Sequence, residues 1–174
     1  MYQKNSFFYS LIILASVVAS GCKNYSFSVN DKTIYTPAGI FKNYQIADAA
    51  LADCVAQTII DLNITRAEDL TRLNCAQAGI KSLRGLDKFF ALTDLNLSEN
   101  QIRDISHLNK LGRLEILLLQ KNKISHTEPL LNLLHLRQVN LSDNSVKDCK
   151  NLQQLQMNLR DNKTQFTLDN VCKT

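Results

Sequence analysis

Aliphatic residues recur at fixed positions in four consecutive segments of 22 residues, which begin at Leu70 and align without a gap. Each segment opens with an apolar-x-x-apolar-x-apolar outline, as in "LTDLNLSENQI" and "LRQVNLSDNSV". The alternation within this outline predicts a short strand with one buried face. The recurring apolar positions are Leu70/Leu92/Leu114/Leu136, Leu73/Leu95/Leu117/Val139, Cys75/Leu97/Leu119/Leu141, Ile80/Ile102/Ile124/Val146 and Leu86/Leu108/Leu130/Leu152.

One such segment cannot bury its own leucines, whereas a stack of segments closes a continuous core between neighbouring coils. Residues 70–157 therefore predict a leucine-rich repeat solenoid of the α/β type, with right-handed coils and a parallel sheet on its concave side. Asn100, Asn122 and Asn144 recur at one further position, where an amide can bond the backbone as the chain leaves the strand. With Ala78 as the exception, this register predicts a structural role for the three asparagines.

The repeat length and the phrase "NQIRDISHLNKL" resemble the internalin-like class of bacterial leucine-rich repeats. The resemblance covers roughly Ile46 to Met157. It implies a helical cap before the first repeat and recognition of a protein through the concave face, without indicating which protein.

A cap is also predicted from the residues before the repeats, over residues 46–69. In "IADAALADCVAQTII" the apolar spacing indicates a helix behind an Asp48 N-cap. Thr65 and Glu68 stand at capping-box spacing, which predicts a second short helix. The first helix would present one apolar face, made of Leu51, Val55 and Thr58/Ile59.

The segments outside the cap and repeats are less regular. In residues 22–45, "NYSFSVNDKTIYTP" alternates apolar and polar residues on both sides of a turn signal, which fits a small hairpin. A mobile tether is the equally weighted alternative, because an isolated hairpin is marginal in water. Residues 158–174 resemble a degenerate final coil, which we expect to cover the open edge of the last repeat.

The first 21 residues indicate export. Lys4 precedes "SFFYSLIILASVVAS", an apolar run without charge, and a small-residue cleavage site follows in "VASGC". We therefore predict a secretory signal peptide over residues 1–21. An uncleaved membrane anchor is the alternative, although the run falls short of the roughly 20 residues that cross a bilayer.

The small residues before Cys22 resemble the lipobox of bacterial lipoproteins, with Ala19 where that motif usually has leucine. The resemblance implies that Cys22 becomes the acylated first residue, carrying diacylglycerol and an N-acyl chain such as palmitate, and that these chains hold the protein on a membrane. Lys23 follows, which under the enteric sorting rule favours the outer membrane. The alternative is an ordinary cysteine that remains after ordinary cleavage.

The other four cysteines are an even number in an exported chain, where disulfides persist. Three pairings are possible. Position favours Cys54 with Cys75, which would join the cap helix to the first strand, and Cys149 with Cys172, which would join the last repeat to the tail. Each bond would stabilise one end of the solenoid by about 3 kcal/mol.

Composition narrows the function further. The chain has 174 residues, of which 45% are apolar, enough for one domain with a core. The net charge of +4 comes without a basic run interleaved with aromatics, so nucleic acid is not expected as a partner. No cysteine pair has zinc-finger spacing and the histidines, His107, His126 and His135, occupy three different repeat positions, so no metal or cofactor is expected.

Catalytic chemistry is not expected either, because it needs a nucleophile, a base and an orienting group that converge in a pocket. Ser98 with Asp94 and Ser142 with Asp143 are the nearest candidates, and neither pair has a histidine column beside it. We therefore expect a monomeric non-enzyme.

The candidate binding site is the set of strand positions that alternate with the buried leucines and form columns across the repeats. Ile116 and Leu118 of the third repeat stand where the other repeats carry polar residues, so we interpret them as the exposed centre of a protein-binding surface. The alternative is that both merely favour strand formation or lie under the N-terminal "YSFSV" segment. The columns are Arg72/Asp94/Ile116/Gln138, Asn74/Asn96/Leu118/Asn140 and Ala76/Ser98/Gln120/Ser142.

Two functions follow from these predictions. In the first, a lipid-anchored module of the bacterial envelope recognises a host or envelope protein through its concave face. In the second, a periplasm-facing scaffold or assembly lipoprotein has no ligand on that face.

Overall fold

The computed structural model describes residues 27–29, 32–35, 39–160 and 163–168. The chain divides into two compact units at Gly39. In the first unit, strands β1 (Phe27–Val29) and β2 (Lys32–Tyr35) pair antiparallel, in agreement with the hairpin interpretation. The predicted signal peptide, the predicted lipidation site at Cys22 and the C-terminal Cys172 lie outside the described residues.

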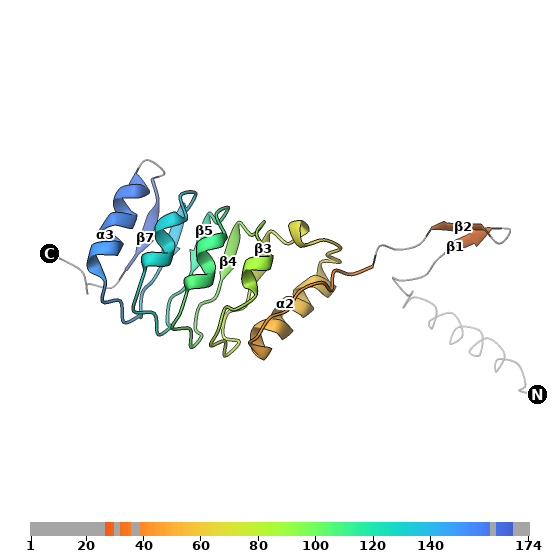
Figure 1. Ribbon diagram of the computed structural model, residues 1–174, viewed down its shortest axis with the longest axis horizontal. Helices are drawn as coiled ribbons and strands as arrows, with labels where there is room; N and C mark the ends of the chain where they lie inside the picture. The colour runs from red at the N-terminus through yellow and green to blue at the C-terminus, as the bar shows by residue number, and fades with distance from the viewer. Residues whose placement is uncertain (1–26, 30–31, 36–38, 161–162, 169–174) are drawn as a thin grey trace, which may run out of the picture. The chain divides into compact units, whose positions relative to one another are not determined.

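The second unit is built on one parallel sheet of five strands in sequential order, drawn from yellow-green to blue in Figure 1. Neighbouring strands pair at equivalent repeat positions, so that the central residue of each strand aligns with the central residue of the next. This arrangement confirms the predicted leucine-rich repeat fold. The strands are β3 (Arg72–Asn74), β4 (Asp94–Asn96), β5 (Ile116–Leu118), β6 (Gln138–Asn140) and β7 (Gln165–Thr167).

Short helices return the chain from the end of one strand to the start of the next (Figure 1). The crossovers of the first three coils are short. Their helical part is therefore a tight 3₁₀ turn rather than a longer α-helix. The fourth crossover contains an α-helix, so the last coil is longer than the others. These elements are η2 (Leu86–Lys88), η3 (Ser106–Lys110), η4 (Glu128–Asn132) and α3 (Cys149–Asn158).

The core lies between the sheet and these helices and runs through all the coils. The central strand residues from β3 to β6 are at most 3% exposed, and the aliphatic residues that recur in the crossovers are buried with them. They form one continuous cluster rather than a core per repeat. Each coil is therefore stabilised chiefly by its neighbours.

The asparagine ladder has the structural role predicted from the sequence. The Asn122 side chain donates to the carbonyls of Leu97 and Leu119 at 2.9 and 3.0 Å, and its Oδ1 accepts the Ile102 N–H at 3.0 Å. Asn100 and Asn144 repeat this pattern one coil before and one coil after. Each amide thus satisfies buried backbone groups of its own coil and of the preceding coil.

The turn before each ladder position passes through one residue in the left-handed region. These residues are Gln77, Glu99, Lys121 and Asp143, with φ values of 58°, 57°, 55° and 55°. A left-handed residue other than glycine costs roughly 1–2 kcal/mol, which the ladder hydrogen bonds offset in the later coils.

The N-terminal cap is helix α2 (Ala49–Asp61), which covers the open end of the core. Its buried face is Leu51, Val55 and Ile59, and Asp48 is its N-cap, as the apolar spacing predicts. The predicted disulfide between Cys54 and Cys75 is present and links the helix to the residue after β3. Of the second predicted pair, Cys149 begins α3 and Cys172 is not described, so that pairing stays a prediction.

The second cap helix is present but is not closed by the predicted capping box. It is the 3₁₀ turn η1 (Ala67–Asp69), whose N-cap is Arg66 and has no side-chain cap bond. The Thr65 hydroxyl donates to the Asp69 carboxylate at 3.3 Å instead of capping the turn. A three-residue turn is too short for the reciprocal bonds that a capping box makes.

Residues 41–45, called the strap below, precede α2 and cross the first coil at Gly85. This glycine has φ of +97°, and a Cβ there would lie 2.1 Å from the backbone oxygen of Gln45. The strap also seats Phe41 and Tyr44 against Phe89, with ring centroids 6.1 and 5.3 Å away. Burial raises the pKa of Tyr44 in this cluster. The first repeat is therefore covered on its crossover side as well as at its end.

Candidate binding face

The strand register brings the predicted binding residues together on the solvent side of the sheet, called the sheet face below. The pairing aligns Arg72, Asp94, Ile116 and Gln138 in one column and Asn74, Asn96, Leu118 and Asn140 in the next. Strand β7 adds Gln165 and Thr167, which sequence comparison of the four repeats could not place.

The asparagines of the second column stabilise the turn that follows each strand. Asn96 Oδ1 accepts the Ser98 N–H at 3.0 Å and the Ser98 hydroxyl at 2.8 Å. Asn140 accepts the same two groups of Ser142 at 3.1 and 2.9 Å. The serine hydroxyls considered as candidate nucleophiles are therefore hydrogen-bonded within these turns.

The third coil lacks this pair of side-chain hydrogen bonds after its strand. Leu118 replaces the asparagine and offers no acceptor, and Gln120 replaces the serine. The Gln120 Oε1 is buried and has no hydrogen-bond partner among the described residues. A buried polar atom without a partner costs on the order of 1–3 kcal/mol, so this exception to the repeat is locally unfavourable.

The apolar centre is less exposed than the sequence suggests. Ile116 and Leu118 are half-buried rather than exposed, because the flanking columns cover part of each side chain. They line a hollow of about 510 Å³, which the C-terminal end of α2 closes on one side. Leu62, the C-cap of that helix, is 57% exposed and lines the same hollow.

Sequence reasoning missed Leu62. It follows Ile59 at helical spacing, and this continuation of the buried face predicts burial rather than exposure. The helix ends at Asp61, however, so Leu62 turns away from the core and meets the sheet face instead. Only the position at which α2 ends could have indicated that Leu62 lies at the sheet face.

Charged groups flank the apolar centre. Glu115 and Arg137, which directly precede Ile116 and Gln138 in the chain, form an ion pair of 3.6 Å with side chains 43% and 72% exposed. Asp94 accepts the Thr93 hydroxyl at 2.6 Å, and Arg72 is exposed. Pairs of this kind contribute little to stability, so they are available as the polar rim of an interface.

A larger hollow, of about 970 Å³, lies against the strap. Among its charged lining side chains, Arg66 pairs with Glu68 at 3.4 Å, and Arg66 also pairs with the neighbouring Asp69 at 2.8 Å. Neither hollow holds a cluster of three metal-ligating side chains, and the described residues contain none elsewhere. Within those residues no helix is both long and apolar enough to cross a membrane.

No family model matches the chain, and no curated protein matches it either. Among solved structures, the chain is similar to an internalin of Listeria monocytogenes, with a TM-score of 0.59 and 30% identity, over 70% of this chain and 36% of that one. It is also similar to a leucine-rich repeat protein of Leptospira interrogans, with a TM-score of 0.50 and 20% identity, over 62% of this chain and 27% of that one. The chain spans a minor part of the length of either protein. Its coils and parallel sheet have the leucine-rich repeat fold and are similar to those of an internalin.

Proposed function

We propose that this protein is a lipid-anchored binding module of the bacterial cell envelope, which recognises a protein through its sheet face. The observation that carries the proposal is the third coil, where a leucine stands in place of a turn-forming asparagine. In the same coil the Gln120 Oε1 has no hydrogen-bond partner among the described residues, so the two exchanges do not serve the stability of the coil. A ligand that packs on Leu118, Ile116 and Leu62 would explain why the third coil carries a leucine at this position.

The proposed ligand-binding centre is small, apolar and enclosed by polar residues. Leu62 from the cap and the two side chains from β5 contribute its apolar surface, and the columns on either side contribute amides and charges. This layout is typical of the centre of a protein interface, where a few buried side chains provide most of the binding free energy. Leucine-rich repeat proteins of the internalin type are binding scaffolds, which supports interaction over catalysis.

The double variant Leu118→Asn with Gln120→Ser tests the proposal, because it gives the third coil the turn of its neighbours. We expect the free energy of unfolding to stay equal or to rise by about 1 kcal/mol as the turn bonds form. Binding should weaken by about 2 kcal/mol or more, since a central apolar contact is lost. Immobilised wild-type and variant chains would be compared for capture of proteins from envelope and host-cell extracts.

The matched control is Ile60→Asn, which removes an exposed aliphatic side chain from α2 outside the hollow. It should capture the same proteins as the wild type. Identical capture by the stable double variant would show that the sheet face around Leu118 is not the binding site.

The anchoring part of the proposal rests on the export signal and the lipobox-type residues before Cys22. We expect the mature chain to begin at an acylated Cys22 and to reside in the outer membrane. The mass of the mature N-terminal peptide tests the acylation, with Cys22→Ser as the control. Digestion of intact cells by added protease would place the module on the cell surface, and complete protection would place it in the periplasm as a scaffold.

A further inference from the structure

One edge of the coils combines apolar and basic side chains. The helix-to-strand edge is defined by four segments at equivalent repeat positions. Segments 88–91, 110–113 and 132–135 begin at the last residue of a 3₁₀ turn, and segment 154–157 lies in the C-terminal part of α3. Five large apolar side chains are exposed in the described part of the chain. Three of them are on this edge, namely Phe90 (48% exposed), Leu134 (55%) and Met157 (62%).

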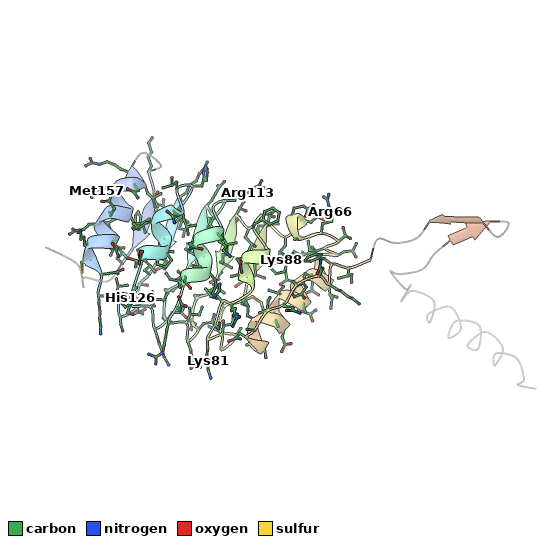
Figure 2. The ribbon with its side chains drawn as sticks, viewed as in Figure 1. Arg66, Lys81, Lys88, Arg113, His126 and Met157 are labelled. Atoms are coloured by element: carbon green, nitrogen blue, oxygen red, sulfur yellow. A yellow bond between two sulfur atoms is a disulfide. The ribbon has the colours of Figure 1, made fainter. Side chains whose placement is uncertain are left out.

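The repeat register lines these side chains up. Phe90, Gly112 and Leu134 occupy the same position in the first three coils, and Met157 lies one position further along in the fourth. Figure 2 shows Met157 and Arg113 along one edge of the array and His126 with Lys81 along the opposite one. These side chains form an interrupted row: Phe90 and Leu134 lie in register two coils apart with Gly112 between them, and Met157 lies within α3.

The charge on this edge has one sign. The four segments contain Lys88, Lys110 and Arg113 and no carboxylate. Lys110 pairs with the neighbouring Asp87 at 2.9 Å. Lys88 and Arg113 are exposed and have no ion-pair partner among the described residues.

The strand-to-helix edge on the opposite side differs in both respects. Residues 99–104, 121–126 and 143–148 together contain four carboxylates and four lysine or arginine side chains, and Glu99 pairs with Lys121 at 3.6 Å. None of the exposed large apolar residues of the described chain lies there. Both edges run along the same coils, and they differ in the apolar and charged side chains that they carry.

We propose that the helix-to-strand edge docks on the surface of a bilayer that contains anionic phospholipids. The row of exposed apolar side chains is interrupted at Gly112 and is accompanied within the four segments by basic charge alone, which matches the surface of an anionic bilayer. The same row can enter the headgroup region of a bilayer, where basic side chains extend along it to the phosphates. The positive sign of the edge complements an anionic surface, to which each basic residue adds about fivefold in partition.

Docking of this kind can be weak and still be populated. The inference rests on the proposed anchoring, because an anchored chain stays close to the bilayer. An anchor gives the edge an effective concentration of the order of millimolar, so a few side chains suffice. Docking by this edge also fixes which way the sheet face points relative to the membrane.

The chain contains no tryptophan, which permits a direct test with a single introduced fluorophore. The full chain would carry Leu134→Trp on the helix-to-strand edge or, as the control, Lys123→Trp on the opposite edge. Both would be reconstituted through their apolar N-terminal segment into vesicles of phosphatidylglycerol and phosphatidylcholine with brominated acyl chains. The bromine quenches only a tryptophan that reaches the lipid.

We expect strong quenching and blue-shifted emission for the tryptophan at 134 and neither for that at 123. In the Leu134→Trp chain, Lys88→Gln with Arg113→Gln should reduce the docked-to-undocked ratio by about 30-fold, since two charges are lost. The same pair of changes at Lys81 and Lys123 should leave that ratio within about twofold. High salt should act like the first pair of changes.

Equal quenching at positions 134 and 123 would overturn the proposal, as would quenching at 134 that the loss of Lys88 and Arg113 does not change. Reconstitution through residues 1–39 does not require acylation of Cys22. A failure of docking is therefore distinct from a failure of the proposed anchoring, which the mass of the mature N-terminus measures, and from a loss of ligand capture by the sheet face.

Discussion

At the scale of single residues, the structure separates repeat positions that stabilise the coil from positions that are free to vary. The ladder asparagines hold buried backbone groups in two coils at once. Ala78 is the exception because β3 is the edge strand of the five-stranded sheet, and no earlier strand of that sheet presents a carbonyl for an amide to bond. The sequence therefore predicts the ladder from spacing alone, since only backbone bonding explains an amide in register.

Replacing Asn122 with alanine should lower the free energy of unfolding by about 1–3 kcal/mol, because it leaves the buried Ile102 N–H without its acceptor. The carbonyls of Leu97 and Leu119 each lose one amide donor and keep the other, from Asn100 and Asn144. Urea unfolding followed by circular dichroism measures the change. Asn109→Ala, at an exposed asparagine of η3, is the control and should shift stability by less than about 0.5 kcal/mol. An Asn122→Ala chain as stable as the control would contradict the structural role of the ladder.

The sequence predicts which residues share each column of the sheet face, but it does not predict how far their side chains are buried. Spacing places Ile116 and Leu118 side by side, because the strand period fixes which residues share a face. It does not report that neighbouring columns half-bury them, nor that Leu62 joins them from the cap. Those contacts depend on where α2 ends relative to the sheet, which is a tertiary distance that no local pattern encodes.

At the scale of elements, Asp48 joins the cap helix to the first coil. Its carboxylate accepts the Leu51 N–H at 3.1 Å and the Lys81 and Ser82 N–H groups at 2.9 and 3.1 Å. Burial alone would raise the pKa of Asp48, but these backbone bonds outweigh it and lower the pKa below its usual value. The cap is thus held by a charged group that must stay ionised.

Asp48→Ala should cost about 1–2 kcal/mol at pH 7, through the loss of the N-cap and of the bonds to the first coil. The folded-state pKa is lowered, so these bonds contribute fully above the unfolded pKa of about 4 and are lost as the pH falls through the folded value. The difference between wild type and variant should therefore shrink below about pH 4. Unfolding free energies measured between pH 3 and pH 7 test this expectation, and a pH-independent difference would contradict it.

The control for this series is Asp53→Ala, at an exposed carboxylate on the same helix. It removes a negative charge without removing a cap, so stability at pH 7 should change by less than about 0.5 kcal/mol. A loss as large as that of Asp48→Ala would assign the effect to helix charge rather than to capping.

At the scale of the whole molecule, stability is shared between neighbours, so an end coil is weaker than a central one. The disulfide between Cys54 and Cys75 lies at the N-terminal end, where it ties the cap to the first strand. Sequence position was enough to favour this pair, because the alternative partners lie near the opposite end of the array. The crossover conformation was less predictable, since the repeat pattern does not separate 3₁₀ turns from α-helices.

A chain with Cys54→Ala and Cys75→Ala should lose about 3 kcal/mol in total, by the loop-closure estimate for a bond of this span. The loss should be uneven. Hydrogen exchange should show faster opening of α2 and β3, with β5 opening last. Uniform acceleration along the array would show that the solenoid unfolds as one unit and that the bond does not act locally.

The ladder amides all point backwards along the chain, because Asn122 reaches the carbonyl of Leu97 and Asn144 that of Leu119. A polypeptide that emerges from a ribosome or a translocation pore does so amino end first. The backbone groups of each coil that bond a ladder asparagine of the next coil therefore gain this partner only after the next coil has emerged. We therefore expect the array to assemble from its amino end, with the cap helix α2 as the surface on which the first coil packs.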